Sequence, residues 1–355
     1  MTTSAFDHPF LGNLLGDPAL LECFSASTDI LQMLRFEIAL AEAEAAEDII
    51  PKDAVAAIKR ATDVFAPDMG ALAAGVARDG VVVPALLTEL RALLDEEHRK
   101  NLHFGATSQD VIDTSLALRL KQACESLLSR FEGVIEALAA LEERDGHIEV
   151  MAHTRMQAAI PVTARRKIRS WREPLERHRT RLERVRSEVE ILHFGGAAGT
   201  LDKLGDKGPA VADRLAKALD LNRVDHPRHS ERDGLADFAS VLSLTTGSLG
   251  KMGQDVALMA QNKMGEVELS GGGGSSAMPH KKNPVKAEAL VTLARFNATL
   301  FPGLHHALVH ENERSGSAWT LEWMLLPQMV MATGAALLRA TELAQGISFK
   351  PSASR

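Results

Sequence analysis

The sequence contains no tyrosine and few aromatic residues of any kind. Its 355 residues include three tryptophans and twelve phenylalanines, and aromatics make up 4% of the chain. The absence of tyrosine excludes a catalytic tyrosine and a binding platform lined with tyrosine rings. An all-β fold is also disfavoured, because strands are enriched in aromatic and β-branched residues.

Cysteine is scarce as well, and the chain has no net positive charge. The two cysteines, Cys23 and Cys124, are too few to form a zinc site by themselves. They could form one disulfide, but such sparse usage is more typical of the reducing cytoplasm, where we expect the protein to be located. The net charge of −7 argues against binding to nucleic acid or to an anionic membrane. The first ten residues lack the basic and apolar regions of a secretory signal.

Long membrane-spanning runs are also missing, since no uninterrupted apolar stretch approaches the roughly 20 residues that cross a bilayer.

The chain instead shows apolar residues at helical spacing. Residues 1–108 predict a small helical domain, with one helix from Asp29 to Pro51 and shorter helices over 52–65 and 84–98. Residues 109–346 predict a bundle of long helices, and 347–355 a tail. The expected fold is all-α.

The pattern of the long segments supports a bundle. Apolar residues spaced by threes and fours from Ile112 to Leu141 form one stripe on a long helix. The segment 235–269 combines heptad-type spacing with small residues on its other faces, which is typical of a helix buried in a large bundle or between subunits. Further helices are expected over 161–192, with an interruption at Pro174, and over 285–310 and 318–346. The strand signal is negligible.

A basic stretch lies inside one of these helices. Between Arg165 and Arg186 there are ten Arg or Lys residues and three Glu. A nucleic-acid site is one interpretation, but only Trp171 could stack on a base within the stretch. A buried apolar stripe runs through the same residues, so we interpret the charges as a solvated basic face.

The segment from Gly271 to Pro284, GGGGSSAMPHKKNP, carries the strongest chemical signal. Four consecutive glycines disfavour a helix and allow the backbone to approach a ligand closely. Pro284 suits the first turn of the helix that follows, whose free amides, together with Lys281 and Lys282, attract anions. A plain Gly/Ser linker is the alternative interpretation, but the specific sequence SSAMPHKKNP that follows the glycines argues against it.

The sequence GSSAMPHKKNP resembles the signature of the fumarase/aspartase superfamily, which includes adenylosuccinate lyase, argininosuccinate lyase and 3-carboxy-cis,cis-muconate cycloisomerase. The resemblance implies that Ser275, the first serine of the pair, is the general base on a loop that closes over the substrate. It also implies that Ser276, Lys281 and Asn283 contact the substrate.

Two other segments resemble the same superfamily. In HFGATSQD, residues 103–110, Thr107 and Ser108 match positions that hydrogen-bond a substrate carboxylate. Read from its residues alone, this segment is a helix N-terminus capped by Thr107 or Ser108. His103 is a further candidate for proton transfer, although a lone histidine is more often structural.

The segment MAHTRMQAAIPVT, residues 151–163, resembles the second shared region but departs from it. Many members have a catalytic histidine directly after the threonine, where this chain has Arg155. His153 therefore remains a catalytic candidate by proximity only. Arg155 suits an additional substrate carboxylate through bidentate pairing, with Thr154 and Gln157 beside it.

Residues 192–201, 231–240 and 310–323 resemble the carboxymuconate cycloisomerase branch most closely. This implies closure of 3-carboxy-cis,cis-muconate to 4-carboxymuconolactone in protocatechuate degradation, with Arg314 binding a substrate anion. The substrate is a small tricarboxylate, which accords with Arg155, Lys281 and Arg314. The resemblance implies no metal, nucleotide or redox cofactor. It also implies a homotetramer whose sites are shared between subunits.

Two alternatives remain open at this point. One is another lyase of the superfamily, such as adenylosuccinate lyase, against which Arg155 argues. The other is a helical scaffold without activity, against which the intact serine loop argues. Members of the superfamily typically continue into a third helical domain, and this sequence ends at Arg355, about where that domain would begin. We expect either that this branch has dispensed with the domain or that the sequence is truncated. Because the motif regions all precede residue 320, we expect the short form to be sufficient for catalysis.

Overall fold

The N-terminal third of the chain folds into short helices around one long one. The structure is a computed structural model that describes residues 4–271, 273–274, 278 and 281–351. Ser25 caps α3 by accepting a hydrogen bond from the Thr28 amide, and the helix then buries its Ala- and Leu-rich face. The helices of this region are α1 (Gly12–Leu15), α2 (Pro18–Cys23), α3 (Ala26–Ala46), α4 (Lys52–Asp63), α5 (Met69–Asp79), α6 (Val83–Ala92) and α7 (Glu96–Arg99).

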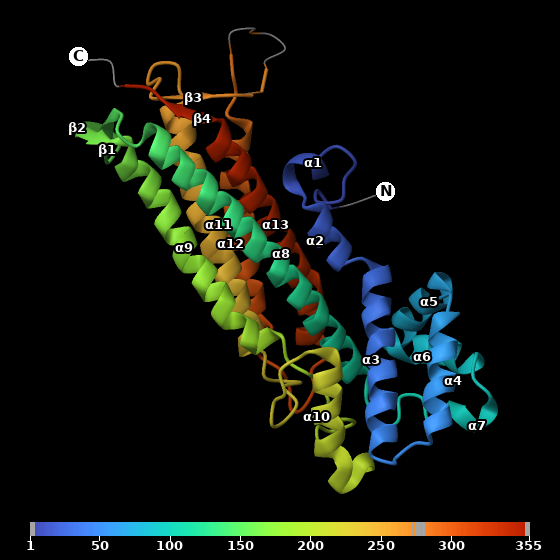
Figure 1. Cartoon of the computed structure of the whole chain (residues 1–355). Coiled ribbons are helices and arrows are strands. Elements are labelled where there is room, and N and C mark those ends of the chain that lie inside the picture. Colours follow the sequence, from blue (N-terminus) through green and yellow to red (C-terminus); the bar gives the residue numbers. More distant parts are fainter. Residues whose placement is uncertain (1–3, 272, 275–277, 279–280, 352–355) are drawn as a thin grey trace.

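Five long helices form a bundle beside this region (Figure 1). They are α8 (Ser108–Asp145), α9 (Ala164–Val189), α11 (Asp233–Met259), α12 (Val285–His306) and α13 (Ser317–Gly346). The stripe predicted from Ile112 to Leu141 is buried along α8 and packs against α9 and α13. With its 38 residues, α8 is about 57 Å long at 1.5 Å per residue. The predicted all-α fold is confirmed.

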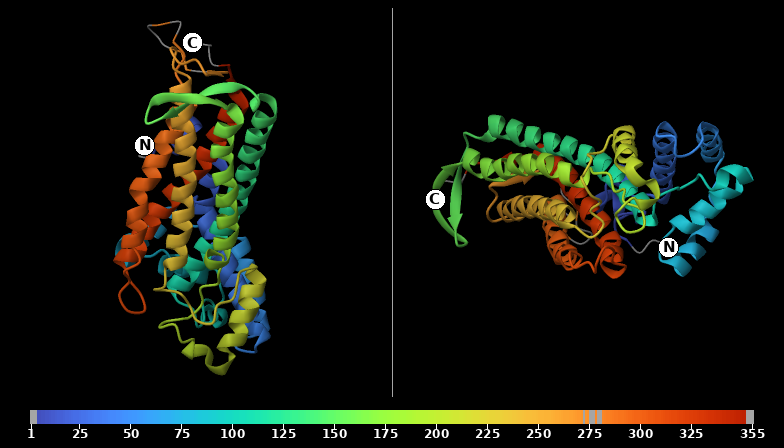
Figure 2. Two further views of the ribbon diagram at one scale, coloured as in Figure 1. Left: turned by 90° about the vertical axis from the view of Figure 1, so that its left-hand side faces the viewer. Right: turned by 90° about the horizontal axis from the view of Figure 1, so that it is seen from below.

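The prediction of negligible strand content is wrong in two small places. Residues Glu149–Thr154 (β1) and Gln157–Thr163 (β2) form an antiparallel hairpin at one end of the bundle (Figure 2). At the same end, Val267–Leu269 (β3) pairs with Ile347–Phe349 (β4). The first hairpin is exposed on both faces of β2, so no alternation of apolar and polar residues marks it in the sequence.

The predictions for two of the long helices also need correction. The helix expected over 161–192 begins at Ala164 and is not interrupted, because α9 continues through Pro174. The buried side chains of Trp171 and Leu175 hold the helix against the bundle on both sides of that proline. The helix expected over 235–269 ends at Met259, and the chain turns before β3.

The hydrophobic residues form two clusters, one inside the bundle and one among the N-terminal helices. The second cluster also receives residues from 192–221, a segment that contains η1 (Asp202–Lys207) and α10 (Gly208–Leu219). The sequence did not predict α10. Because this segment packs on α3, it brings a loop from the middle of the chain to the N-terminal end of α8.

One helix in the part of the chain that the structure describes, α13, is long and apolar enough to cross a membrane. Its most apolar window is 61% buried by other parts of the fold. Such burial is what the central helix of a bundle requires, since a helix that is hydrophobic on all sides must be covered.

Candidate active site

The N-terminal end of α8 is built by a capping box. Thr107 is the N-cap residue, as predicted, and its amide donates to Asp110 Oδ2 at 2.9 Å. Thr107 and Ser108 are both half-buried, so neither residue is enclosed by the protein. A helix N-terminus attracts anions through its free amides and its dipole. This end of α8 can therefore bind a carboxylate.

Arg314 lies at this helix end, although it is 207 residues away from Thr107 in the sequence. Its Nη1 donates to Thr107 Oγ1 at 3.2 Å, and its Nε donates to Gln109 Oε1 at 2.9 Å. Its Nη2 lies 3.3 Å from the carbonyl oxygen of Ala197. The structure thus brings together Thr107, Ser108 and Arg314, three residues that the sequence assigned to the site.

A hollow of about 760 Å³ opens beside Arg314, between the helix α13 and the loop before α6. Trp319, Trp323 and Met324 line one side of it, and Asp79 lies on the other. The volume is large enough for a small organic acid. The hollow therefore offers space next to Arg314, whereas Thr107 and Ser108 are not among its lining residues.

Asp110 connects α8 to the loop that carries the other contacts of Arg314. Its two carboxylate oxygens accept hydrogen bonds from the amides of Gly195 and Gly196, each at 2.9 Å. His229 Nε2 lies 2.9 Å from Asp110 Oδ1. Asp110 is fully buried, so these contacts replace the water that the carboxylate loses on folding.

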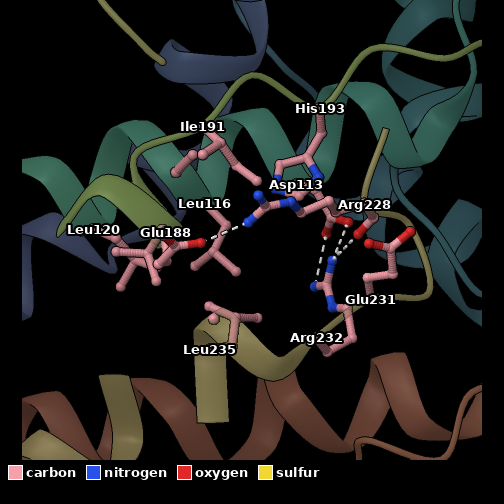
Figure 3. A pocket seen from close by; sticks show the side chains of 13 residues that line it. Asp113, Leu116, Leu120, Glu188, Ile191, His193, Arg228, Glu231, Arg232 and Leu235 are labelled. Atoms are coloured by element: carbon pink, nitrogen blue, oxygen red, sulfur yellow. Dashed lines mark hydrogen bonds and ion pairs between the residues drawn. The ribbon is translucent and has the colours of Figure 1, made fainter. Parts of the chain in front are cut away.

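A second buried network of charges surrounds Arg232. Arg232 Nη1 donates to Asp113 Oδ2 at 2.8 Å, and its Nε donates to Glu322 Oε1 at 2.8 Å. Figure 3 shows the guanidinium of Arg232 pointing toward Asp113. Trp319 Nε1 donates to the same carboxylate at 2.8 Å. The three charged side chains come from α8, α13 and the residue that precedes α11, and so tie these helices together.

Burial and charge together shift the pKa values of two residues in and beside this network. Burial works against the Asp113 carboxylate, but the positive charge of Arg232 lowers its pKa overall to about 2. Burial lowers the pKa of His193 to about 3, so this imidazole is neutral at physiological pH. The adjacent cavity has a volume of about 20 Å³, room for a single water molecule. We therefore interpret the network as a scaffold for the site above it.

His103 is held by a carboxylate from α3. Its Nδ1 lies 2.7 Å from Glu37 Oε1, which is buried. A second buried carboxyl, that of Glu44, lies on α3 about two helical turns after Glu37. Burial, and secondarily the charge of Glu37, raises the pKa of Glu44 to about 9. The contact with Glu37 orients the His103 ring, as carboxylates orient catalytic histidines in other enzymes.

A stability prediction follows from the raised pKa of Glu44. A carboxyl whose pKa is raised in the folded state favours folding below its unfolded pKa, and this contribution is lost as the pH rises through the folded value. The change Glu44→Gln keeps the shape and removes the titration. We expect the variant to be more stable than the wild type by about 1–3 kcal/mol at pH 7 and above, with no gain near pH 4.5.

Denaturant unfolding measured from pH 4.5 to pH 9 checks this expectation. Glu42→Gln on the same helix is the matched control, because the Glu42 side chain is exposed and pairs with Lys59 at the surface. It should leave the pH dependence unchanged. A stability difference between Glu44→Gln and wild type that stayed constant with pH would show that Glu44 is charged in the folded protein.

The second group of predicted site residues lies at the opposite end of the bundle. His153, Thr154, Arg155 and Gln157 are exposed in the β1–β2 hairpin. Arg155 and Met156 form its two-residue turn, with positive φ angles of 48° and 66°. Such angles are uncommon for side chains of this size and persist where the surroundings or a function require them. The turn displays Arg155 to solvent.

The signature segment lies at the same end as the hairpin. Asn283 and Gly273 exchange two backbone hydrogen bonds of 2.8 and 3.0 Å, which close the base of the loop. Lys281 is exposed and its amide donates to the carbonyl oxygen of Met278. Ser275 and Ser276, the predicted base and its neighbour, lie outside the described residues. Lys281 and Asn283 stand before α12 with Pro284, as the sequence predicted.

The two groups of predicted residues are therefore separated by the length of the bundle (Figure 1). Thr107, Ser108 and Arg314 lie where α8 begins, and Arg155 follows shortly after the residue where α8 ends. The span of about 57 Å is far longer than any side chain. One chain cannot bring both groups to one small substrate.

Sequence analysis missed the residues that support the site, namely Glu37, Gln109, Asp110, Asp113, Arg232 and Glu322. Gln109 and Asp110 fall inside the motif at 103–110, so their position was a signal that they matter. Arg232 and Asp113 are 119 residues apart, and no local pattern marks two distant charges as partners.

Comparison with known proteins identifies the family. The lyase family model matches residues 17–297. The chain is 39% identical to 3-carboxy-cis,cis-muconate cycloisomerase from Bradyrhizobium diazoefficiens, over 96% of this chain and 76% of the relative. It is 38% identical to the Pseudomonas putida enzyme of the same name, over 98% of this chain and 82% of the relative. The chain belongs to the fumarase/aspartase family of lyases.

Solved structures of family members have the same fold. The crystal structure of 3-carboxy-cis,cis-muconate lactonizing enzyme from Pseudomonas putida matches with a TM-score of 0.90 and 37% identity, over 96% of this chain and 77% of that one. A fumarate lyase from Mesorhizobium sp. BNC1 matches with a TM-score of 0.88 and 33% identity, over 94% and 76%. The family and the branch predicted from the motifs are confirmed. The roles of the individual site residues stay predictions.

Proposed function

We propose that this lyase-family member is a cycloisomerase that closes 3-carboxy-cis,cis-muconate to 4-carboxymuconolactone. The similarity to relatives of that name over most of the chain supports the proposal. The observation that carries it is the position of Arg314, which joins the hydroxyl of Thr107 at the start of α8. A guanidinium and a helix N-terminus together form a carboxylate site, and Arg155 and Lys281 supply cations for two further carboxylates.

The proposed reaction closes a ring within one substrate molecule and consumes one proton, which the enzyme group recovers from the solvent. One substrate carboxylate adds to a carbon of a double bond, and the carbon next to another carboxylate takes up a proton. In the reverse direction a base removes that proton and the ring carboxylate leaves. Negative charge then builds on the activating carboxylate, which preorganised donors at Thr107, Ser108 and Arg314 stabilise. The chemistry needs no metal or redox cofactor.

Ser275 is the proposed group for the proton transfer, in agreement with its place in the signature. The second candidates are His103 and His153. Of these two, His103 has the environment of a histidine that moves protons, because Glu37 fixes the orientation of its ring. Thr154, Gln157, Ser276 and Asn283 are proposed as further substrate contacts.

We propose that the active site is shared between subunits of a homotetramer in the cytoplasm. The separation of the two residue groups along the bundle supports a shared site, since a second chain running in the opposite direction brings one end beside the other. In this assembly, residues 109–346 are the oligomerisation core, 1–108 the small N-terminal domain and 347–355 the tail. A two-fold arrangement of helices is the commonest way to achieve such pairing.

Turnover of the purified protein tests the proposed function. We expect the ultraviolet absorbance of the conjugated diene to disappear when 3-carboxy-cis,cis-muconate is added, and adenylosuccinate to remain unchanged. Turnover of adenylosuccinate alone would show a different lyase of the family. If neither compound reacted while the protein remained folded and oligomeric, the inactive scaffold would be the correct interpretation.

A further inference from the structure

Arg314 is carried by a loop, yet its predicted task demands a fixed position. The loop spans residues 307–316 between α12 and α13, and the Arg314 side chain is exposed. A long flexible side chain at such a place loses conformational freedom when it binds a ligand, unless the protein already holds it. Its Nε–H bond to Gln109 Oε1, at 2.9 Å, is the shortest of its contacts with the rigid helix α8.

The amide of Gln109 has a defined orientation. Its Nε2 donates one hydrogen bond to Asp113 Oδ2 at 3.1 Å and one to the carbonyl oxygen of His229 at 2.9 Å. Both N–H groups are thus used, and Oε1 is left to accept from Arg314. A flipped amide would place its oxygen against two acceptors and its N–H groups against the guanidinium. Gln109 is 0% exposed, so water cannot compensate for such a flip.

Asp113, which accepts a hydrogen bond from Gln109 Nε2, is also held in a fixed position. Asp113 is 1% exposed and accepts further hydrogen bonds from Arg232 Nη1 and Trp319 Nε1, both at 2.8 Å. Its carboxylate therefore cannot turn toward or away from Gln109 without breaking bonds to two other elements. The buried network fixes Asp113, Asp113 fixes the Gln109 amide, and the amide oxygen fixes Arg314 Nε.

We propose that Gln109 is the positioning residue of Arg314, and that the buried Asp113–Arg232 pair acts on substrate binding through it. The inference rests on the proposed function, in which Arg314 binds a substrate carboxylate. With Nε held by Gln109 and Nη1 by Thr107, the guanidinium plane is set before the substrate arrives. Gln109 itself is enclosed by protein and does not touch the substrate.

A double-mutant cycle between Gln109 and Arg314 tests this. Gln109→Met keeps the side chain's size and removes the amide, and we expect KM to rise about 10- to 100-fold, the effect of losing a hydrogen bond to a charged group, with a much smaller change in kcat. Arg314→Ala should raise KM at least as much. In the double variant, Gln109→Met should add little, because no guanidinium remains to be positioned.

Gln32→Met is the matched control. Gln32 is a buried glutamine on α3, outside the site, so its replacement removes a buried amide without touching Arg314. It should leave KM unchanged. If the effects of Gln109→Met and Arg314→Ala on KM were additive, or if Gln109→Met lowered only thermal stability with an unchanged KM, the positioning role would be wrong while the proposed function stood.

Calorimetric titration with tricarballylate, a stable tricarboxylate, tests the same relation without turnover. Gln109→Met should weaken binding about tenfold or more in the wild-type background and not in the Arg314→Ala background. This result would support the positioning role even if carboxymuconate were not turned over, in which case only the proposed reaction would fall. Equal weakening in both backgrounds would overturn the inference.

Discussion

Mixing two inactive variants, Arg155→Ala and Arg314→Ala, is expected to restore activity. Each variant alone should lose about 100-fold or more in kcat/KM, the typical effect of removing one partner of a charge pair with the substrate. The two residues lie at opposite ends of a bundle about 57 Å long, so a shared site takes them from different chains. In a mixed oligomer, some sites receive an intact Arg155 from one variant and an intact Arg314 from the other.

The size of the recovery follows from random assembly. With equal amounts of both chains, roughly a quarter of the sites contain both intact residues, since each is present with a probability of one half. The measurement is the initial rate of diene loss after the variants are coexpressed, or unfolded and refolded together. Refolding each variant separately gives the background rate.

A matched pair from the same end of the bundle supplies the control. Thr107 Oγ1 accepts a hydrogen bond from Arg314 Nη1 at 3.2 Å, so both residues of any one site come from the same chain. Mixing Thr107→Ala with Arg314→Ala should therefore give no recovery. If the Arg155 and Arg314 variants also failed to complement each other in a mixed oligomer, the shared site would not include Arg155.

The elements that sequence analysis predicted are those encoded by local or periodic patterns. The predicted cap, Thr107 or Ser108, follows from hydroxyl residues before a helix start, and the structure shows that it is Thr107. The stripe from Ile112 to Leu141 follows from helical spacing. The superfamily motifs predicted a carboxylate site at Thr107 and Ser108, because the residues of each motif are contiguous in the sequence, and the roles of these two residues stay predictions. These features depend on interactions over a few positions, which a sequence displays directly.

The features that were missed depend on distant partners or atypical turns. The β1–β2 hairpin turns at Arg155-Met156, whereas tight hairpin turns with positive φ are ordinarily marked by Asn-Gly or Asp-Gly. Pro174 was read as a break, but the bundle packing around α9 outweighs the lost hydrogen bond. The contact between Gln109 and Arg314 spans 205 residues, and only the folded chain reveals it.

Replacing Arg232 should be the most destabilising single change in the site. Arg232 is 4% exposed and neutralises two buried carboxylates, Asp113 and Glu322. Arg232→Met has a similar length but leaves both carboxylates without a positive partner, which costs about 3–5 kcal/mol of unfolding free energy. The variant should unfold at a markedly lower urea concentration. Arg184→Met, at an exposed pair with Asp237, should cost less than about 1 kcal/mol.

The stability difference between the wild type and Arg232→Met is expected to change with pH in a defined direction. In the wild type the pKa of Asp113 is lowered to about 2, so its contribution to stability is present above its unfolded pKa near 4 and is lost as the pH falls toward 2. Without Arg232, burial raises that pKa instead, and stability decreases as the pH rises above about 4. Urea unfolding between pH 4.5 and pH 8 should therefore show a gap between the two proteins that widens with pH. A gap that stays constant with pH would mean that Arg232 contributes by packing alone, because packing does not titrate, and that the charge of Asp113, which anchors Gln109, does not depend on Arg232.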